Sequence, residues 1–304
     1  MSKYSSANIV EKEYLHFLST QEIQTKPFHD KIGQLNNYYL PICEKIYQDY
    51  VKEKKIKIIG LTGGQGAGKS TITQILRLIL EIKYNLSVVC FSIDDFYKTL
   101  SERTSLAKNV NKLFKTRGVP GTHDTILINK IFTNLTKKKF KPVLVPRFDK
   151  SRDDRFPKKY WQKINQQPKI IIFEGWCVGA RPQNNKDLLK PINILEKKQD
   201  LDSKWRSRVN NELKNAYKKI FSKIDMLIFL KVPSFDCVYK WRLLQEKKLR
   251  LTSRSKKIMS PLQVRKFIMY YERITMQMLK DLSNKAHAVL FLDKQHRFNK
   301  IKFN

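Results

Sequence analysis

A glycine-rich segment between an apolar run and a helical pattern constrains the fold of this 304-residue chain more than any other feature. It consists of Gly63, Gly64, Gln65, Gly66, Ala67, Gly68, Lys69, Ser70 and Thr71, and it contains the pattern G-x-x-x-x-G-K-[ST]. Glycines let the backbone wrap a phosphate group with the N–H groups turned inward, and a following helix adds its positive N-terminal end. The apolar run 56–61 precedes the segment, and isoleucines recur at helical spacing over 72–82. The sequence therefore predicts a strand, a phosphate-binding loop and a helix.

All nine residues of the loop are expected to surround the phosphates of ATP, and two side chains have specific expected roles. Lys69 should reach the β- and γ-phosphates, and the Ser70 hydroxyl should bind Mg²⁺. A glycine-rich turn without function is the alternative interpretation. The strand before the loop and the helix after it argue against that alternative.

Five short apolar runs, at 56–61, 86–93, 169–173, 226–232 and 288–292, are separated by helical patterns. Continuous apolar strands between helices are typical of a parallel sheet that is covered on both faces. We predict an α/β fold of three layers, of the P-loop NTPase type, with a mostly parallel five-stranded sheet. In such folds ligands bind at the carboxyl ends of the strands.

The chain divides into two regions by pattern. Residues 1–55 are polar and helical, and are interpreted as an accessory segment that packs on the main domain, residues 56–304. The main domain carries three insertions rich in loops or irregular structure, at about 100–125, 142–168 and 180–205. Arg242, in the charged helical stretch 238–250, is a candidate for a helical lid that folds over a transferred phosphate, although a surface helix with salt bridges is equally consistent.

Carboxylates follow two of the predicted strands. Asp94 and Asp95 end the second strand, and Glu174 ends the third. Asp94 is interpreted as the base for a hydroxyl nucleophile and as a metal ligand, and Glu174 as a carboxylate near Mg²⁺. Helix capping is the alternative for each of them, and either aspartate of the pair could be the cap.

Two insertions contain clustered arginines, in residues 117–124 and 146–155. Arginine holds a carboxylate through two parallel hydrogen bonds, so the cluster suggests capture of an anionic substrate. Arg117 and Arg147 are the first candidates for that contact, and solvated surface arginines are the alternative.

Charge and composition limit the function classes. The chain has 61 basic and 27 acidic residues, a net charge of +34, with lysines spread along it in short runs. We interpret this charge as compositional: nucleic-acid motifs and repeats are absent, so no specific nucleic acid is expected, although an anionic substrate would be attracted. No apolar run is long enough to span a membrane, so no membrane partner is expected.

The four cysteines, Cys43, Cys90, Cys177 and Cys237, are not at metal-binding spacing. The first 18 residues contain no uninterrupted apolar run and already include acidic residues, unlike a typical organelle transit peptide. We expect a reduced, cytoplasmic protein. The sequence does not determine its oligomeric state.

Taken together, these motifs resemble the D-glycerate 3-kinase family, relatives of phosphoribulokinase, uridine kinase and pantothenate kinase. The segment SIDDFY at 92–97 points to this wider group. The segments RGVPGTHD at 117–124, PRFDKSRDDR at 146–155, FEGWCVGARP at 173–182 and YYERIT at 270–275 point to glycerate kinase. The resemblance runs from about residue 56 to residue 292.

The resemblance implies a P-loop kinase domain that uses ATP and Mg²⁺ to phosphorylate a small anionic hydroxy acid, D-glycerate, to 3-phosphoglycerate. It implies that Asp94 is the hydroxyl-activating carboxylate. It also implies that an acceptor site forms from the two arginine-containing segments, with Tyr97, Arg117, His123, Asp124 and Arg147 as its candidate residues.

Two alternatives remain open. A uridine- or pantothenate-type kinase on the same scaffold would be stimulated by those acceptors and not by glycerate. A P-loop ATPase stimulated by nucleic acid is favoured only by the net charge, and would show salt-dependent binding to DNA or RNA.

Overall fold

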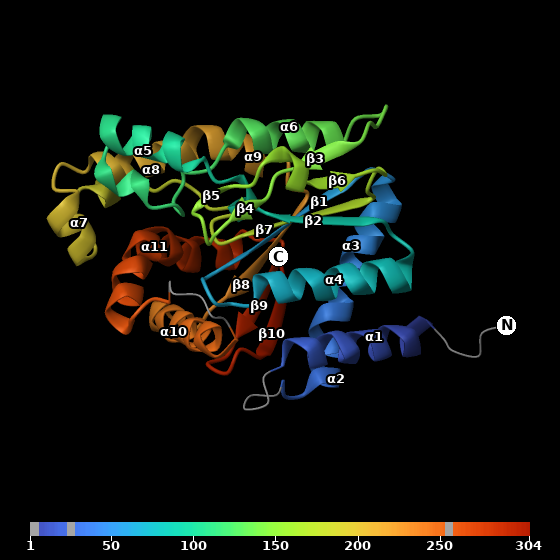
Figure 1. Cartoon of the computed structure of the whole chain (residues 1–304). Helices are drawn as coiled ribbons and strands as arrows, with labels where there is room; N and C mark the ends of the chain where they lie inside the picture. The colour runs from blue at the N-terminus through green and yellow to red at the C-terminus, as the bar shows by residue number, and fades with distance from the viewer. Residues whose placement is uncertain (1–5, 23–27, 253–257) are drawn as a thin grey trace.

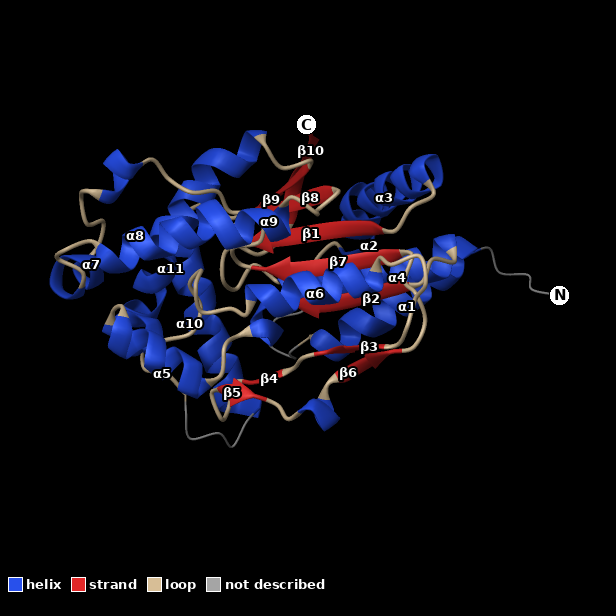
Figure 2. Cartoon of the chain, turned by 90° about the horizontal axis from the view of Figure 1, so that it is seen from above, coloured by secondary structure: helices blue, strands red, loops and turns tan. Residues whose placement is uncertain are grey.

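The computed structural model describes residues 6–22, 28–252 and 258–304, so parts of the expected N-terminal segment and of the loop before residue 261 lie outside the described residues. At its centre is a six-stranded sheet in the order β10-β9-β8-β1-β7-β2 (Figures 1 and 2). The strands are β1 (Lys57–Gly63), β2 (Val88–Ser92), β7 (Ile170–Gly175), β8 (Met226–Lys231), β9 (Ala288–Leu292) and β10 (Phe298–Phe303).

The five predicted strands all exist and pair in parallel. The sixth strand, β10, was not predicted and pairs antiparallel with β9 through a hairpin. Its alternating lysines and its position at the sheet edge hide it from an analysis based on continuous apolar runs. The mostly parallel three-layer fold is thus confirmed, with one more strand than expected.

Alternate residues of each strand face opposite layers of helices. Along β1, Ile58 joins one apolar cluster, while Ile59 and Leu61 join the other. The first cluster includes residues of α6 (Thr125–Leu135), α8 (Lys204–Glu212), α9 (Lys218–Phe221) and α11 (Pro261–Asp281). The second includes residues of α1 (Ser6–Gln21), α3 (Leu40–Glu53), α4 (Lys69–Tyr84) and α10 (Phe235–Thr252). Figure 1 shows α6 and α9 on one side of the sheet and α1, α3 and α4 on the other.

The described residues of the N-terminal region are mostly helical. Helix α1, the short α2 (Lys31–Gln34), a π-helical turn (Leu35–Tyr39) and α3 follow in sequence. Helices α1 and α3 both contact α4, and the buried residues of this region belong to the same apolar cluster as β1. The segment therefore packs directly on the main domain.

The first two insertions are more regular than predicted. Residues 100–125 contain α5 (Leu100–Asn109) and a 3-10 turn (Lys112–Lys115) instead of only loops. A capping box between Thr99 and Glu102 starts α5, and this pair is a sequence signal that apolar periodicity does not register. Residues 142–168 form two small antiparallel pairs of strands. In one pair β3 (Val143–Val145) lies beside β6 (Gln162–Ile164), and in the other β4 (Phe148–Asp149) lies beside β5 (Asp154–Arg155). A 3-10 turn (Lys158–Tyr160) connects β5 to β6.

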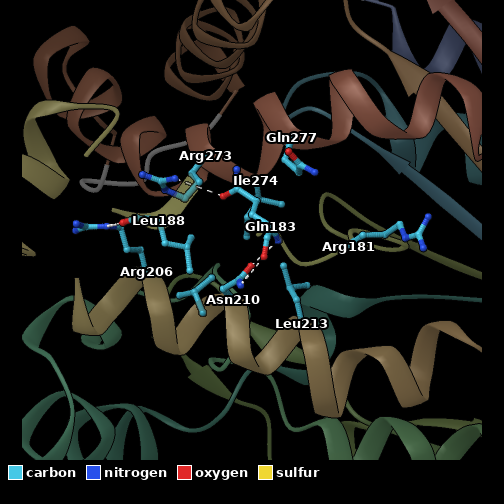
Figure 3. A pocket seen from close by; sticks show the side chains of 10 residues that line it. Arg181, Gln183, Leu188, Arg206, Asn210, Leu213, Arg273, Ile274 and Gln277 are labelled. Atoms are coloured by element: carbon cyan, nitrogen blue, oxygen red, sulfur yellow. Dashed lines mark hydrogen bonds between the residues drawn. The ribbon is translucent and has the colours of Figure 1, made fainter. Parts of the chain in front are cut away.

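The third insertion, 180–205, is held by buried ion pairs. It contains a 3-10 turn (Asn185–Leu188) and α7 (Ile194–Gln199). Arg273 of α11 pairs with Glu196 at 2.6 Å, and Arg206 of α8 pairs with Asp200 at 2.8 Å. Figure 3 shows both arginines beside a cavity of about 10 Å³, which has room for roughly one water molecule. The cavity is too small to be a substrate site.

The remaining elements complete the two layers. A 3-10 turn (Ile93–Phe96) follows β2, a π-helical turn (Leu213–Tyr217) joins α8 to α9, and a 3-10 turn (Leu282–Asn284) follows α11. The four cysteines are all free in the structure. Within the part of the chain that the structure describes, every helix is too short or too polar to cross a lipid bilayer.

Candidate active site

The glycine-rich segment forms a tight loop between β1 and α4, which begins at Lys69. Gly66 and Gly68 have φ angles of +80° and +81°, a region that side chains with a Cβ rarely occupy. The Lys69 ammonium group donates hydrogen bonds to the carbonyl oxygens of Gly63 and Gly64, both at 3.1 Å. Burial lowers the pKa of Lys69, while the nearby carboxylates of Glu174 and Asp94 oppose that shift. The loop thus combines its backbone N–H groups, the N-terminus of α4 and the Lys69 ammonium group, a combination suited to binding phosphate.

Two residues support the loop from outside. A Cβ at Gly66 would lie 2.8 Å from the Cβ of Trp241 on α10, so glycine is required there. The His296 Nε2 atom lies 3.0 Å from the Gly66 carbonyl oxygen, and its ring packs on Trp241 with a centroid distance of 3.8 Å. The loop is therefore attached both to the proposed lid helix and to the β9–β10 hairpin.

Ser70 and Glu174 meet at the end of β7. The Ser70 hydroxyl donates to the Glu174 carboxylate at 3.3 Å, and Glu174 is only 8% exposed. Burial raises the pKa of Glu174, and the charge of Lys69 opposes this effect. A hydroxyl and a carboxylate beside a phosphate-binding loop are the donor set that Mg²⁺ takes together with substrate phosphates, so these residues fit the expected metal. The described residues contain no cluster of three or more histidine, cysteine, aspartate or glutamate side chains able to hold a metal without substrate.

The geometry separates the two aspartates that the sequence left equivalent. Asp95 accepts a hydrogen bond from the Ser92 backbone N–H and completes the capping box of the turn after β2. Asp94 accepts hydrogen bonds from the Tyr97 hydroxyl and the Lys150 ammonium group, both at 2.8 Å. Asp94 also acts electrostatically on Lys69 and Glu174. Asp95 thus belongs to the capping box of the turn, whose N-cap is Ser92, and Asp94 acts on the residues of the phosphate-binding site.

Lys150 is a site residue that is not among the acceptor-site candidates expected from the sequence. Burial would raise the pKa of Asp94, but the charge of Lys150 and the hydrogen bonds from Lys150 and Tyr97 lower it to about 2. The Asp94 carboxylate in turn raises the pKa of Lys150. The two residues are 56 positions apart and meet because the β4–β5 hairpin folds back toward β2.

The charge of Arg117 acts on Lys150, the residue that pairs with Asp94. Burial and the Asp94 charge raise the pKa of Tyr271, whereas the charges of Arg117 and Arg242 lower it. The Tyr271 hydroxyl donates to the Arg117 carbonyl oxygen at 3.2 Å, and the Trp176 indole N–H donates to the Gly118 carbonyl oxygen at 2.9 Å. The backbone around Arg117 is therefore held by residues from segments 173–182 and 270–275, two of the segments that carry the family resemblance.

The other predicted acceptor residues have different surroundings. Asp124 caps α6 through the Leu127 N–H and pairs with Arg155, so it anchors its loop instead of facing the site. Arg147 is 56% exposed, and its side chain lies 3.7 Å from Asp95.

His123 is buried, with 1% exposure, and its ring stacks on Tyr97 with a centroid distance of 4.5 Å. Its Nδ1 atom lies 2.6 Å from the Tyr217 hydroxyl, while Nε2 has no hydrogen-bond partner among the described residues. Burial lowers the pKa of His123 to about 3, so the ring is neutral. The ring supports Tyr97, and its direct contact with a substrate stays a prediction.

Arg242 lies on α10, next to Trp241. It forms an ion pair with Glu246 and lies over the Phe267 ring at 5.6 Å from the centroid. The backbone nitrogen of Arg242 lies 3.5 Å from the position of a Cβ built on Gly66, so Arg242 lies beside the phosphate-binding loop. The lid role of Arg242 stays a prediction.

Sequence comparison supports the class of protein that this arrangement indicates. Residues 58–194 match the phosphoribulokinase / uridine kinase family. The uncharacterized kinase mug58 of Schizosaccharomyces pombe is 37% identical, over 81% of this chain and 91% of that protein. The probable ATP-dependent kinase TDA10 of Saccharomyces cerevisiae is 33% identical, over 80% and 85% of the two chains.

Proteins named as glycerate kinases are also similar. The chloroplastic D-glycerate 3-kinase of Arabidopsis thaliana is 29% identical, over 72% of this chain and 49% of that protein. The solved structure of D-glycerate 3-kinase from Cryptococcus neoformans has a TM-score of 0.74 at 21% identity, and the match covers 88% of this chain and 99% of that one. The structural likeness shows a shared fold.

The fold, the phosphate-binding loop and the relatives define a P-loop kinase. The chain belongs to the phosphoribulokinase / uridine kinase family.

Proposed function

We propose that this kinase uses ATP and Mg²⁺ to phosphorylate a small hydroxy acid, and that its acceptor is D-glycerate, yielding 3-phosphoglycerate. The observation that carries the proposal is the Asp94 carboxylate, which accepts a hydrogen bond from Lys150 at 2.8 Å and acts electrostatically on Lys69 of the phosphate-binding loop. In this proposal the acceptor hydroxyl lies at Asp94 and the acceptor carboxylate is bound by Arg117. The similarity to proteins named D-glycerate 3-kinase supports this choice of acceptor.

In this proposal the chain's own residues bind and orient the two substrates. The loop N–H groups and Lys69 hold the ATP phosphates, and Ser70 and Glu174 hold Mg²⁺, with Asp94 nearby. The metal, when bound, would offset charge on the phosphates. Asp94 accepts the hydrogen bond of the acceptor hydroxyl and receives its proton as the phosphoryl group moves in line. Tyr97 and Lys150 fix the carboxylate, and Arg242 approaches from α10.

A second candidate function has some support. Uridine-cytidine kinase-like 1 of Mus musculus and the pantothenate kinase of Latilactobacillus sakei are each 27% identical, over 61% and 52% of this chain. A nucleoside offers no carboxylate to Arg117, so this arrangement favours an acid over uridine. Pantothenate is itself a hydroxy acid, and only a direct comparison of acceptors separates it from glycerate.

The test is a coupled assay of ADP release with D-glycerate, L-glycerate, pantothenate and uridine as acceptors. We expect D-glycerate to give the highest kcat/KM, and the product to be 3-phosphoglycerate by mass and by reaction with a 3-phosphoglycerate-specific coupling enzyme. Higher kcat/KM with pantothenate or uridine would replace the proposed acceptor. Single-stranded RNA in the same assay is expected to leave ADP release unchanged.

Replacing Arg117 with lysine should raise the KM for glycerate strongly and leave the KM for ATP nearly unchanged. Lysine keeps the charge but loses the planar fork that binds a carboxylate through two hydrogen bonds. Losing one hydrogen bond to a charged group costs ~1.5–3 kcal/mol, which corresponds to roughly a 10- to 100-fold change in KM. Arg147→Lys should raise the same KM less, because Arg147 is 56% exposed. If both variants have wild-type KM for glycerate, the carboxylate is bound elsewhere.

Replacing Lys150 with methionine should create an acid limb in the pH dependence of kcat/KM. The pKa of Asp94 is lowered to about 2 by Lys150, so Asp94 stays ionised down to low pH in the wild type. Without that cation, burial raises the pKa of Asp94, and protonation of the base begins to limit turnover as the pH falls. A profile measured from pH 5 to 9 tests this, with Lys108→Met on the exposed face of α5 as the control. Parallel profiles for wild type and Lys150→Met would contradict the expectation.

A further inference from the structure

The largest fully buried side chain of the described residues is an arginine, Arg103 of α5. It donates hydrogen bonds to the carbonyl oxygens of Lys98, Lys115 and Asp153, and it pairs with the Asp153 carboxylate at 3.1 Å. These three carbonyls belong to the segment after the Asp94 turn, to the segment before Arg117 and to the β4–β5 hairpin. One buried cation thus joins the three loops around the acceptor side of the site.

The Asp153 carboxylate is shared between two arginines. The same oxygen that pairs with Arg103 also accepts a hydrogen bond from Arg117. Both guanidinium groups lie over the Phe148 ring, at 5.9 Å and 5.4 Å from its centroid. Asp153 has a φ of +59°, a left-handed backbone conformation that aspartate tolerates, and this conformation is held at the tip of the hairpin by the Arg103 bonds.

The charges of this cluster decide what Arg117 can do. Arg103 and Arg117 contribute +2 and Asp153 contributes −1, so the cluster keeps a net charge of +1. Arg103 is 0% exposed, whereas Arg117 is 27% exposed. The surplus positive charge is therefore available only at Arg117. If Arg103 were neutral, Asp153 and Arg117 would form a closed pair with no net charge for an anion.

We propose that Arg103 is a positioning residue for the acceptor: its buried charge neutralises Asp153 and leaves Arg117 able to bind the carboxylate of the substrate. This inference rests on the proposed function in that it requires an anionic acceptor. It does not require that the acceptor be glycerate. Arg103 touches neither the phosphate-binding loop nor Asp94 in the described contacts, so its effect should be confined to the acceptor.

The first test is the variant Arg103→Met, compared with Arg77→Met, which removes a partly exposed arginine paired with Glu81 on α4. Removing a unit charge from this partly buried cluster should raise the KM for glycerate at least about tenfold, with the KM for ATP within twofold of wild type. The KM for the neutral analogue D-glyceramide should change much less than the KM for glycerate. Equal changes for the two acceptors would show a general structural role and overturn the proposal.

The second test separates charge from folding. In the double variant Arg103→Met with Asp153→Asn, Arg117 no longer faces an uncompensated carboxylate, so the KM for glycerate should return toward the wild-type value. The single variant Asp153→Asn retains all the Arg103 bonds to backbone carbonyls and should have a KM for glycerate equal to or below that of the wild type. A strong increase in this KM for Asp153→Asn would overturn the proposal, even if Arg103→Met fails to fold.

The outcomes also distinguish this inference from the proposed function. If the wild type prefers another carboxylate such as pantothenate, the glycerate assignment fails, and the three variants are measured with that acceptor and its amide instead. If the wild type phosphorylates glycerate but Arg103→Met leaves the KM for it unchanged, only the present inference fails. If the wild type uses no anionic acceptor, both fail.

Discussion

Replacing Lys69 with alanine is expected to reduce phosphoryl transfer by roughly 10²–10³-fold or more, because a preorganised cation at the transferring phosphate is lost. The Lys69 ammonium group already lies inside the loop, bonded to the Gly63 and Gly64 carbonyl oxygens. Nothing else in the described loop supplies a positive side chain at that point. The decisive measurement is single-turnover transfer from ATP to the best acceptor, with nucleotide affinity measured separately by calorimetry.

The fold should survive this change. Lys69 forms no ion pair among the described residues, and water can replace its two bonds to backbone carbonyls at the open end of the loop. The melting temperature is expected to stay within a few degrees of the wild type. Lys83→Ala, an exposed lysine near the end of the same helix, serves as the matched control and should retain full activity. Wild-type turnover by Lys69→Ala would refute the assignment of the loop.

The parallel sheet was predictable because its strands are buried on both faces. Runs such as Ile170–Phe173 are apolar at every position, and the structure buries all of them. The phosphate-binding loop was predictable for a different reason. Its glycines and the Lys69-Ser70 pair are required by local backbone geometry. Because these residues are consecutive in the chain, the loop can be recognised from a short stretch of sequence.

Secondary-structure elements stabilised by local polar contacts were harder to predict from the sequence. Helix α5 begins with a capping box and has little apolar periodicity, so its region was interpreted as loop-rich. Strand β10 alternates lysine with apolar residues at an edge that only the β9 hairpin defines. Both depend on interactions that a search for apolar runs does not weigh.

The partners of the site residues were the hardest to foresee. Asp94 and Asp95 are adjacent and chemically identical, and only their partners separate them: Lys150 from a hairpin 56 residues away and the Ser92 backbone N–H. The same holds for Arg117 with Asp153, 36 residues away. Such pairs depend on how insertions fold over the strand ends, which no local pattern in this chain specifies.

Replacing Asp94 with asparagine is expected to lower kcat by ~10²–10⁴-fold, the range typical of a lost general base, while nucleotide binding persists. Asparagine has nearly the same shape, but one side of its amide donates instead of accepting. Either Tyr97 or Lys150 would then face a donor in place of a carboxylate oxygen. The hydroxyl of the acceptor would lose the group that orients it and takes its proton. Steady-state kcat and calorimetric ADP affinity, measured on the same preparation, separate the two effects.

Asp95→Asn is the matched control, since it changes the neighbouring residue in the same way. The amide oxygen of asparagine can accept the same hydrogen bond from the Ser92 backbone N–H, so the capping box can be kept and the turn after β2 should persist. Asp95 has no contact with Lys150 or Tyr97 in the described structure, and we expect kcat to fall less than about tenfold, because a cap contributes only ~1 kcal/mol. If Asp95→Asn proves the damaging change and Asp94→Asn the mild one, then the carboxylate bonded to Tyr97 and Lys150 is not the base. In that case Lys150 would have to be regarded as holding Asp94 away from the acceptor.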